Sequence, residues 1–258
     1  MRTIVITGSA GGIGAATRVR LEKEGHRVIG VDVRDAEVIA DLSTPAGRAA
    51  MIDAVTAACD GVLDGLVAGA GIMSQEPSLV STNYFGAVAT LTGLRPLLVR
   101  GADPSAVAIS SNSTTTTPNL PNELVDVLLA GDEAASLDAF AQAPGVFAYP
   151  ASKLALARWV RRAATTEEWI GAGIRLNAVA PGVTRTPMTE NDMAFIFSIP
   201  DVFPVPIARP GRPDEIGATL AFLLSPDAGF FCGSVVFVDG GSDAAVRADD
   251  VPSARGDV

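Results

Sequence analysis

Short apolar runs rich in β-branched residues alternate along most of this chain with stretches of helical periodicity, and this alternation constrains the fold more than any other feature. Strands are expected at residues 3–7, 28–32, 38–42, 63–68, 106–110, 174–180 and 234–238. Helices are expected at residues 12–24, 45–59, 79–100, 150–169 and 213–224. Parallel strands need long crossover connections, and a parallel sheet is covered on both faces. The alternation therefore predicts an α/β fold of the Rossmann type, with a doubly wound, seven-stranded parallel sheet and helices on both faces.

Two internal stretches and the carboxyl-terminal tail depart from this rhythm. Residues 112–148 carry a polar run, prolines at 118 and 121 and two short helical patterns, at 123–130 and 133–142, which indicates an insertion. Residues 188–207 are rich in Phe, Ile, Val and Pro without a clean period, which favours a substrate lid. The tail, residues 242–258, is polar and acidic and is expected to be loose. A length of 258 residues suits one domain, so we predict a single domain over residues 1–258.

Charge and residue usage exclude several classes of function. The formal net charge of -10 disfavours binding to nucleic acid and to anionic membrane surfaces. No apolar run approaches the roughly 20 residues of a membrane-spanning helix, and no signal-peptide pattern is present, so we expect a cytoplasmic protein. The single histidine, His26, argues against Ser-His-Asp hydrolysis and multi-histidine metal sites, and Cys59 and Cys232 lie far apart. No metal is therefore expected.

A glycine-rich turn joins the first predicted strand to the first predicted helix. It reads Thr7-Gly8-Ser9-Ala10-Gly11-Gly12-Ile13-Gly14, with glycines at 8, 12 and 14. Glycine at these positions lets the backbone turn sharply and approach a pyrophosphate, whose charge is met by free N–H groups at the start of a helix. The alternative is an ordinary glycine-rich turn, but its place between a strand and a helix favours dinucleotide binding.

An acidic residue ends the second predicted strand. Asp32 lies 18 residues after Gly14, close to the roughly 20-residue offset at which a carboxylate binds the ribose hydroxyls of NAD. It would repel the 2′-phosphate of NADP, and Ser9, Ala10 and Val33 supply no basic side chain to reverse that preference. Arg34 is the one cation nearby in sequence, and a solvated surface aspartate is the alternative interpretation. The sequence predicts NAD as the cofactor.

Tyr149 and Lys153 are four residues apart and so share one face of a helix. This spacing alone is weak evidence, because an exposed helix face would also explain it. The chain, however, also has Ser110 and Ser111 at the end of a predicted strand and Asn83 in the preceding helix. The combination of these residues is stronger evidence for a functional site than the Tyr–Lys spacing alone.

At this combination the chain resembles the short-chain dehydrogenase/reductase family, in its single-domain form, from Arg2 to about Gly241. Besides the turn and the Tyr–Lys pair, the matching stretches are Ala70-Gly71, Asn83 to Gly86, Ile109 to Ser111, Asn177, Pro181-Gly182, Thr184, Thr186 and Val238 to Gly241. The resemblance implies a hydride transfer between NAD(H) and an alcohol or ketone. Within the family, residues 30–44 and the insertion are most similar to bacterial hydroxysteroid dehydrogenases and carbonyl reductases.

The resemblance also implies a role for each site residue. Tyr149 would be the general acid and base, Lys153 would bind the nicotinamide ribose and lower the pKa of the tyrosine, and Ser111 would hold the substrate oxygen. Asn83 would hold a water in the proton relay. The implied cofactor-binding residues are Gly8, Ser9, Gly12, Ile13, Gly14, Asp32, Asp41, Leu42, Ala70, Gly71, Tyr149, Lys153, Pro181, Gly182, Val183, Thr184 and Thr186.

One stretch departs from the family pattern. Two asparagines that the family usually carries after the fourth strand are replaced by Ala68 and Gly69. Their side-chain hydrogen bonds must then be met by backbone groups or by water.

The sequence predicts an NAD-dependent alcohol dehydrogenase/carbonyl reductase acting on a bulky hydrophobic, alicyclic or hydroxysteroid-like secondary alcohol. The bulky preference depends on the apolar residues of the lid: Met188, Met193, Phe195, Ile196, Phe197, Ile199, Val202, Phe203 and Val205. These residues could equally pack on the core. A catalytically inactive NAD-binding sensor or scaffold of the same fold is the alternative function. The insertion is expected to block the interface through which most relatives form tetramers, leaving a homodimer, with a homotetramer as the alternative.

Overall fold

The structure, a computed structural model, confirms the predicted sheet and describes residues 1–200 and 203–250. Seven parallel strands lie in the order β3-β2-β1-β4-β5-β6-β7. They are β1 (Thr3–Thr7), β2 (Arg27–Asp32), β3 (Val38–Ile39), β4 (Gly65–Ala68), β5 (Ser105–Ile109), β6 (Arg175–Pro181) and β7 (Val235–Val238). The strand order reverses beside β1, so a crevice opens between the carboxyl ends of β1 and β4, the usual ligand site of doubly wound folds.

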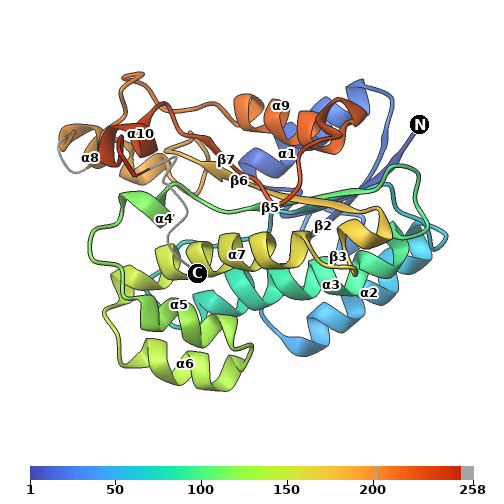
Figure 1. Ribbon diagram of the computed structural model, residues 1–258, viewed down its shortest axis with the longest axis horizontal. Coiled ribbons are helices and arrows are strands. Elements are labelled where there is room, and N and C mark those ends of the chain that lie inside the picture. Colours follow the sequence, from blue (N-terminus) through green and yellow to red (C-terminus); the bar gives the residue numbers. More distant parts are fainter. Residues whose placement is uncertain (201–202, 251–258) are drawn as a thin grey trace.

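Helices cover both faces of the sheet (Figure 1). The α-helices are α1 (Gly12–Lys23), α2 (Pro45–Ala58), α3 (Ala87–Leu98), α4 (Ser113–Thr116), α5 (Asn122–Leu129), α6 (Glu133–Ala141), α7 (Ala148–Ala164), α8 (Met193–Ser198), α9 (Pro213–Leu224) and α10 (Ser242–Val246). A π-helix, η1 (Ser81–Gly86), precedes α3, and the 3-10 helices are η2 (Gly145–Phe147), η3 (Ile170–Ala172), η4 (Glu190–Asp192) and η5 (Pro226–Ala228). Helices α1 and α9 pack on one face, and α2, α3 and α7 cover the other.

Each face of the sheet has its own hydrophobic core. One core contains Ile4, Ile6 and Val67 from the strands and is closed by Ile216 and Leu220 of α9. The larger core lies on the opposite face, and includes Met51 of α2, Leu91 of α3 and Leu156 of α7. Strands buried on both sides explain why the sequence of each strand is an almost continuous apolar run.

Two predicted elements differ from the structure near the cleft. The strand predicted at 38–42 pairs only at Val38 and Ile39, because the carbonyls of Leu42 and Ser43 accept hydrogen bonds from the Arg48 side chain instead of from a strand. The helix predicted at 79–100 opens as the π-helix η1, where the Ser81 carbonyl also accepts from Arg48. Local periodicity does not predict such long-range partners.

Residues 112–148 fold into α4, α5, α6 and η2. Helix α5 packs against α7, and α6 packs on the outer side of α5 (Figure 1). Buried Leu124, Val125 and Leu128 of α5 join the larger core. The insertion thus covers the outer side of α7, the helix that carries Tyr149 and Lys153.

The lid and the tail contain more helix than the sequence pattern indicated. Residues 188–207 include η4 and α8, and Ile196 of α8 lines the cleft. The tail begins with α10, which packs against α4, so residues 242–246 are ordered by this contact rather than loose. Val202 and residues 251–258 lie outside the described residues. No helix in the described part of the chain is long and apolar enough to cross a membrane.

Candidate active site

A cleft of about 880 Å³ runs along the carboxyl ends of the strands. One end is lined by the β1–α1 turn, Asp32 and residues 41–43, and the other by Tyr149, α4 and the lid. Most of the predicted site residues line it: Gly8, Gly12, Ile13, Gly14, Asp32, Asp41, Leu42, Ala70, Gly71, Ser111, Tyr149, Lys153, Pro181, Gly182, Val183, Thr184 and Thr186. The fold therefore brings together residues that are up to 178 positions apart in the sequence, from Gly8 to Thr186.

The glycine turn is closed by backbone contacts that exclude side chains. Gly8 has φ +75°, in the left-handed region, and its N–H donates to the Val31 carbonyl at 2.8 Å. A Cβ on Gly14 would lie 2.0 Å from the Gly8 carbonyl oxygen, so only glycine fits there. A Cβ on Gly12 would lie 2.7 Å from the Thr186 side chain, across the cleft. The turn thus forms a smooth backbone cradle at the start of α1.

Asp32 and the loop after β3 form the wall beside this turn. The Asp32 carboxylate accepts the Ala10 N–H at 3.0 Å and the Val33 N–H at 2.8 Å, so its position is defined by the turn itself. Asp41 is exposed, and its hydrogen bonds from Ser43 lower its pKa. Arg34 also lines this end of the cleft and is exposed, so a cation does lie near Asp32.

The structure explains the departure at Ala68 and Gly69. The buried Thr7 hydroxyl accepts the Gly69 N–H at 3.1 Å and the Ala70 N–H at 3.2 Å. A Cβ on Gly69 would approach the Thr7 carbonyl oxygen and the Ile109 side chain to 2.9 Å. A threonine side chain therefore binds the N–H groups of this stretch, and a residue larger than glycine does not fit at position 69.

Tyr149, Lys153 and Ser111 meet at the other end of the cleft. Tyr149 lies in the first turn of α7, and Lys153 follows one turn later, with its Nζ 5.8 Å from the centre of the Tyr149 ring. The Lys153 ammonium is buried and donates to the Ile109 carbonyl at 2.9 Å. Ser111 follows β5, and its Oγ accepts the Ser113 N–H at 3.1 Å, which leaves the hydroxyl proton of Ser111 available to Tyr149 or to a ligand.

Burial sets the protonation behaviour of this pair. Burial raises the pKa of the Tyr149 phenol above its ordinary value, and a hydrogen bond with Ser111 only partly opposes it. Burial also lowers the pKa of the Lys153 ammonium to about 8. Burial and a nearby ammonium act on the pKa of Tyr149 in opposite directions, and the expected lowering by Lys153 stays a prediction.

Two predicted residues do not line the cleft. Asn83 is fully buried, and its amide binds the backbone of Ile72 in both directions, accepting at 2.8 Å and donating at 2.9 Å. This pairing holds the segment after β4 against η1, and the role of Asn83 in holding a water stays a prediction. Ser9 is also buried, and its Oγ points under β2 toward Gly30 rather than into the cleft.

The segment after β6 is held by a cluster of threonines. Thr189 Oγ1 donates to the Thr184 carbonyl at 2.5 Å and accepts from the Thr186 N–H at 3.2 Å. The Thr184 hydroxyl donates to the Gly182 carbonyl at 2.9 Å. These bonds fix the turn between β6 and the lid, and Thr189 was not predicted.

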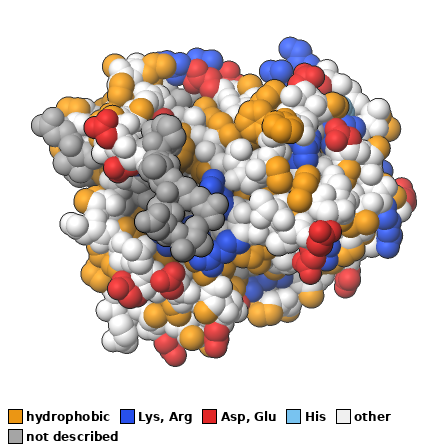
Figure 2. Space-filling model, viewed as in Figure 1, with side chains coloured by type: hydrophobic (Ala, Val, Ile, Leu, Met, Phe, Trp, Pro, Cys, Tyr) orange, Lys and Arg blue, Asp and Glu red, His pale blue; other side chains and the backbone are white. Residues whose placement is uncertain are grey.

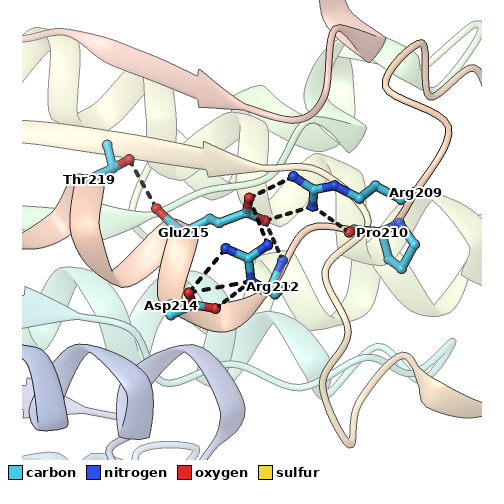
Figure 3. A network of polar contacts seen from close by, with 6 residues as sticks. All are labelled: Arg209, Pro210, Arg212, Asp214, Glu215 and Thr219. Atoms are coloured by element: carbon cyan, nitrogen blue, oxygen red, sulfur yellow. Dashed lines mark hydrogen bonds and ion pairs between the residues drawn. The ribbon is translucent and has the colours of Figure 1, made fainter.

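The lid is attached at its far end by a surface network (Figure 3). Arg209 binds both carboxylate oxygens of Glu215 in α9, at 2.9 and 2.7 Å, and this interaction lowers the pKa of Glu215 to about 2. Glu215 also accepts the Arg212 N–H at 2.8 Å, which caps α9. The Ile207 N–H donates to the Gly240 carbonyl at 3.1 Å. The lid therefore ends on α9 and on the segment after β7.

The predicted apolar residues of the lid divide into two groups. Met188, Ile196, Phe203 and Val205 line the cleft. Met193, Phe197 and Ile199 are half-buried and are not among the residues that line it. Val202 and the side chain of Phe195 lie outside the described part of the chain.

Several lining residues were missed by sequence reasoning. Ser113, Thr116 and Thr117 of the α4 segment face the cleft, and Ser242 joins them from the start of α10. The polar run directly after Ser111 could have indicated these residues. It was interpreted only as part of an insertion, without a contact with the site. Among the described residues no cluster of His, Cys, Asp or Glu could hold a metal ion.

The residues of the cleft fit a nicotinamide dinucleotide. The cradle at Gly8 and Gly14 has room for a pyrophosphate but not for a side chain, and α1 begins there with free N–H groups. Asp32 lies beside the cradle, as a ribose-binding carboxylate requires. Between this wall and Tyr149, the cleft is lined by residues at the carboxyl ends of four strands, β1, β4, β5 and β6.

Comparison with known proteins identifies the relatives of this chain. The family described as "short chain dehydrogenase" matches residues 2–120, and the family described as "Enoyl-(Acyl carrier protein) reductase" matches residues 133–243. The chain is 43% identical to a 3-alpha-hydroxysteroid dehydrogenase/carbonyl reductase of Comamonas testosteroni, over 96% of this chain and 98% of the relative. It is 33% identical to a cis-4-hydroxycyclohexanecarboxylate dehydrogenase of Sinomonas cyclohexanicum, over 94% and 97%.

The fold has a solved counterpart. The crystal structure of a 3-alpha-hydroxysteroid dehydrogenase from Pseudomonas sp. B-0831 in complex with NADH aligns with a TM-score of 0.87 and 43% identity. The alignment covers 96% of this chain and 99% of the other. The full-length match, together with the placement of Tyr149, Lys153 and Ser111, confirms the resemblance seen in the sequence.

Proposed function

The chain belongs to the short-chain dehydrogenase/reductase family, and on that premise we propose that it is an NAD(H)-dependent oxidoreductase interconverting a secondary alcohol and a ketone. The observation that carries this proposal is the single cleft that joins the glycine cradle and Asp32 at one end to Tyr149, Lys153 and Ser111 at the other. A carbinol bound beside Tyr149 would meet a proton-transfer group and the cofactor site at once.

Tyr149 acts as the general base in alcohol oxidation and as the general acid in ketone reduction. As the phenolate, Tyr149 takes the proton of the carbinol oxygen while hydride leaves the carbinol carbon for the cofactor, and as the phenol it returns that proton to the oxygen in ketone reduction. Ser111 donates its hydroxyl proton to the substrate oxygen, while its Oγ accepts the Ser113 N–H. Bound NAD supplies the ring carbon that exchanges hydride with the substrate.

Lys153 is the group that brings the pKa of Tyr149 toward neutral pH. Its ammonium lies 5.8 Å from the centre of the phenol ring, and at an effective dielectric near 20 a charge at this distance favours the phenolate by about 3 kcal/mol. Burial of the phenol opposes this. The tyrosine therefore becomes an efficient base when a cofactor cation adds to the charge of Lys153.

The preferred cofactor is NAD rather than NADP. Asp32 is fixed beside the cradle, and a 2′-phosphate there would meet a carboxylate and lose the ribose contacts. The expected cost to NADP is a few kcal/mol, or roughly two orders of magnitude in affinity. Arg34 opposes this preference from the same wall. Equal kcat/KM with the two cofactors would overturn the assignment.

The substrate is a bulky hydrophobic, alicyclic or hydroxysteroid-like alcohol. Met188, Ile196, Phe203 and Val205 provide an apolar wall, and burying an unpaired charge against it is costly. Two relatives are named for alicyclic alcohols, a 3-alpha-hydroxysteroid and cis-4-hydroxycyclohexanecarboxylate, although the second also carries a carboxylate. The test is a panel of steroid, alicyclic and aromatic alcohols followed by NADH absorbance. Higher kcat/KM on lactate or malate than on any alicyclic alcohol would contradict the proposal.

The alternative is an inactive NAD-binding sensor or scaffold of the same fold. The retention of Tyr149, Lys153 and Ser111 in one cleft favours the enzyme. The same panel separates the two functions. A protein that binds NADH but turns over no alcohol or ketone in the panel would favour the sensor.

We also propose a homodimer formed through α9 and β7. Helices α5 and α6 cover α7, which removes that helix from a tetramer interface. Strand β7 is the last strand of the sheet, and Phe222 of α9 and the nearby Phe230 are exposed. Figure 2 shows hydrophobic side chains gathered over α9 on this face. Light scattering tests the assembly, and a stable tetramer built through α3 and α7 would contradict it.

A further inference from the structure

We propose that Glu133, in the insertion, is a positioning residue for the cofactor, acting through Arg48 on the loop at residues 41–43. The inference rests on the proposed function, because that loop lines the cofactor end of the cleft. Glu133 lies 85 positions from Arg48 in the sequence and does not line the cleft itself.

Arg48 in α2 is the centre of the arrangement. Its guanidinium is buried and donates to three backbone carbonyls: Leu42 at 2.8 Å, Ser43 at 3.2 Å and Ser81 at 2.8 Å. Two consecutive carbonyls of the cofactor loop are thus held by one side chain. The third carbonyl belongs to η1, the π-helix that also carries Asn83.

Glu133 supplies the negative charge that this buried cation needs. Its two carboxylate oxygens bind the two terminal nitrogens of Arg48 at 2.6 and 2.7 Å, a bidentate pair in which 10% of the arginine side chain and 23% of the glutamate side chain are exposed. Hydrogen bonding to Arg48 lowers the pKa of Glu133. Fork-to-fork geometry of this kind fixes the orientation of the guanidinium as well as its charge.

The position of Glu133 is itself well defined. It is the first residue of α6, whose N-terminus is capped by Asp132 through the Ala135 N–H at 3.0 Å. A carboxylate in the first turn is also favoured by the helix dipole. Helix α6 rests on α5, and α5 on α7, so the carboxylate is presented to Arg48 from a packed support.

Removing the charge of Glu133 would leave a buried guanidinium held only by neutral carbonyls. Such a cation is costly, and a shift toward solvent or toward the exposed Asp41 would release the Leu42 and Ser43 carbonyls. The wall of the cofactor site would then lose its fixed shape. The insertion therefore acts on the cleft twice, directly through α4 and at the opposite end through Glu133.

The experiment compares NADH affinity, measured by fluorescence titration of the purified full-length protein, with steady-state kinetics. Glu133→Gln should raise the Kd for NADH roughly 3- to 10-fold, since one charge-assisted contact is lost, while kcat changes less than about twofold. Glu133→Asp, which keeps the charge but shortens the reach, should give an intermediate Kd.

Two controls separate positioning from general weakening of the insertion. Glu123→Gln makes the same change of charge at an exposed position of α5 and should leave the Kd unchanged. Leu128→Ala removes a fully buried side chain of α5, and should lower thermal stability without moving the Kd at a temperature where the protein is folded.

The outcomes discriminate between the inference and the proposed function. A wild-type Kd in Glu133→Gln, or an equal loss of affinity in Leu128→Ala, would refute the positioning role. A wild-type protein that fails to bind NADH at all would instead overturn the proposed function. Loss of affinity in Glu133→Gln alone, with kcat preserved, supports the inference.

Discussion

The two ends of the cleft are held in different ways. At the cofactor end, the glycine turn is built from consecutive residues and closed by backbone contacts. The Gly8 N–H donates to a carbonyl of β2, and Gly14 packs against the Gly8 carbonyl oxygen. The lid end is built from side chains on separate elements, tied down by the Thr189 hydroxyl and by the Arg209–Glu215 pair. The comparison teaches that the glycine cradle depends on the absence of side chains. The proposed cofactor preference of Asp32, turnover and substrate choice depend on their presence.

Tyr149→Phe is the change with the largest expected effect at the side-chain end. Removing one hydroxyl should lower kcat by roughly 10²- to 10⁴-fold, because no proton acceptor would remain at the carbinol, while the Kd for NADH stays near that of the wild type. A direct NADH absorbance assay and a fluorescence titration measure the two quantities.

Tyr84→Phe is the matched control for this change. Tyr84, the other tyrosine of the chain, is buried in the core, where burial raises its pKa to about 12. We expect its loss to leave kcat nearly unchanged. Near-normal turnover in Tyr149→Phe would mean that another residue carries the proton.

Gly14→Ala tests the backbone end. The new Cβ would lie 2.0 Å from the Gly8 carbonyl, so the turn must open, at a cost on the order of 1–3 kcal/mol and with loss of NADH affinity. Gly101→Ala makes the same kind of clash, 1.9 Å from the Leu63 carbonyl, away from the cleft. Both variants should melt at lower temperature, but only Gly14→Ala should bind NADH more weakly. Equal NADH affinities in the two variants would break the proposed distinction.

Lys153→Met separates stability from function in one residue. Burial lowers the pKa of Lys153 from 10.5 to about 8, so below pH 8 the folded state carries a buried cation at a cost of about 3 kcal/mol. The lost bond to Ile109 offsets part of this, so we expect a gain on the order of 1–2 kcal/mol at pH 7 together with lost activity.

The pH dependence of that gain follows from the direction of the shift. Between pH 8 and 10.5 the unfolded chain holds more protons at Lys153 than the folded protein, so the wild type recovers stability as pH rises. The gain in free energy of unfolding of Lys153→Met over wild type should therefore be full below pH 8 and should reverse above about 10.5, where only the lost bond to Ile109 remains. Any residual oxidation by Lys153→Met should have the pKa of its basic limb raised, because the phenolate loses a nearby cation. Denaturant unfolding at both pH values decides this, and a constant difference would argue against a buried cation.

Glu215→Gln should have the smallest effect, because its ion pair with Arg209 is exposed to solvent (Figure 3). We expect KM for a bulky alcohol to rise by about two- to threefold as the end of the lid loosens, with the Kd for NADH unchanged. Asp214→Asn removes a neighbouring charge that pairs with Arg212 and should leave KM as it is. A change in NADH affinity in Glu215→Gln would show that the two ends of the cleft are coupled through the lid.

The sequence by itself determined the features that depend on short-range rules. The alternation of strand and helix patterns predicted a doubly wound parallel sheet. Such patterns can be recognised in a sequence because the periods of 2 and 3.6 residues are set by local backbone geometry. The glycine turn and Asp32 were predictable because a strand, a turn and a helix follow one another along the chain. The position of Tyr149 and Lys153 on the same face of one helix was predictable because four residues make about one helical turn.

Only the tertiary structure decided the features that depend on contacts between distant residues. The amide of Asn83 is used by Ile72, and the hydroxyl of Ser9 points under β2, although sequence position suggested the cleft for both. Burial of the phenol, which raises the pKa of Tyr149, is a property of the packed protein. The pairing of Arg48 with Glu133 across 85 positions has no local signal at all. Spacing along the chain determines which face of a helix or strand a side chain occupies. The residues that it contacts on other elements depend on how those elements pack together.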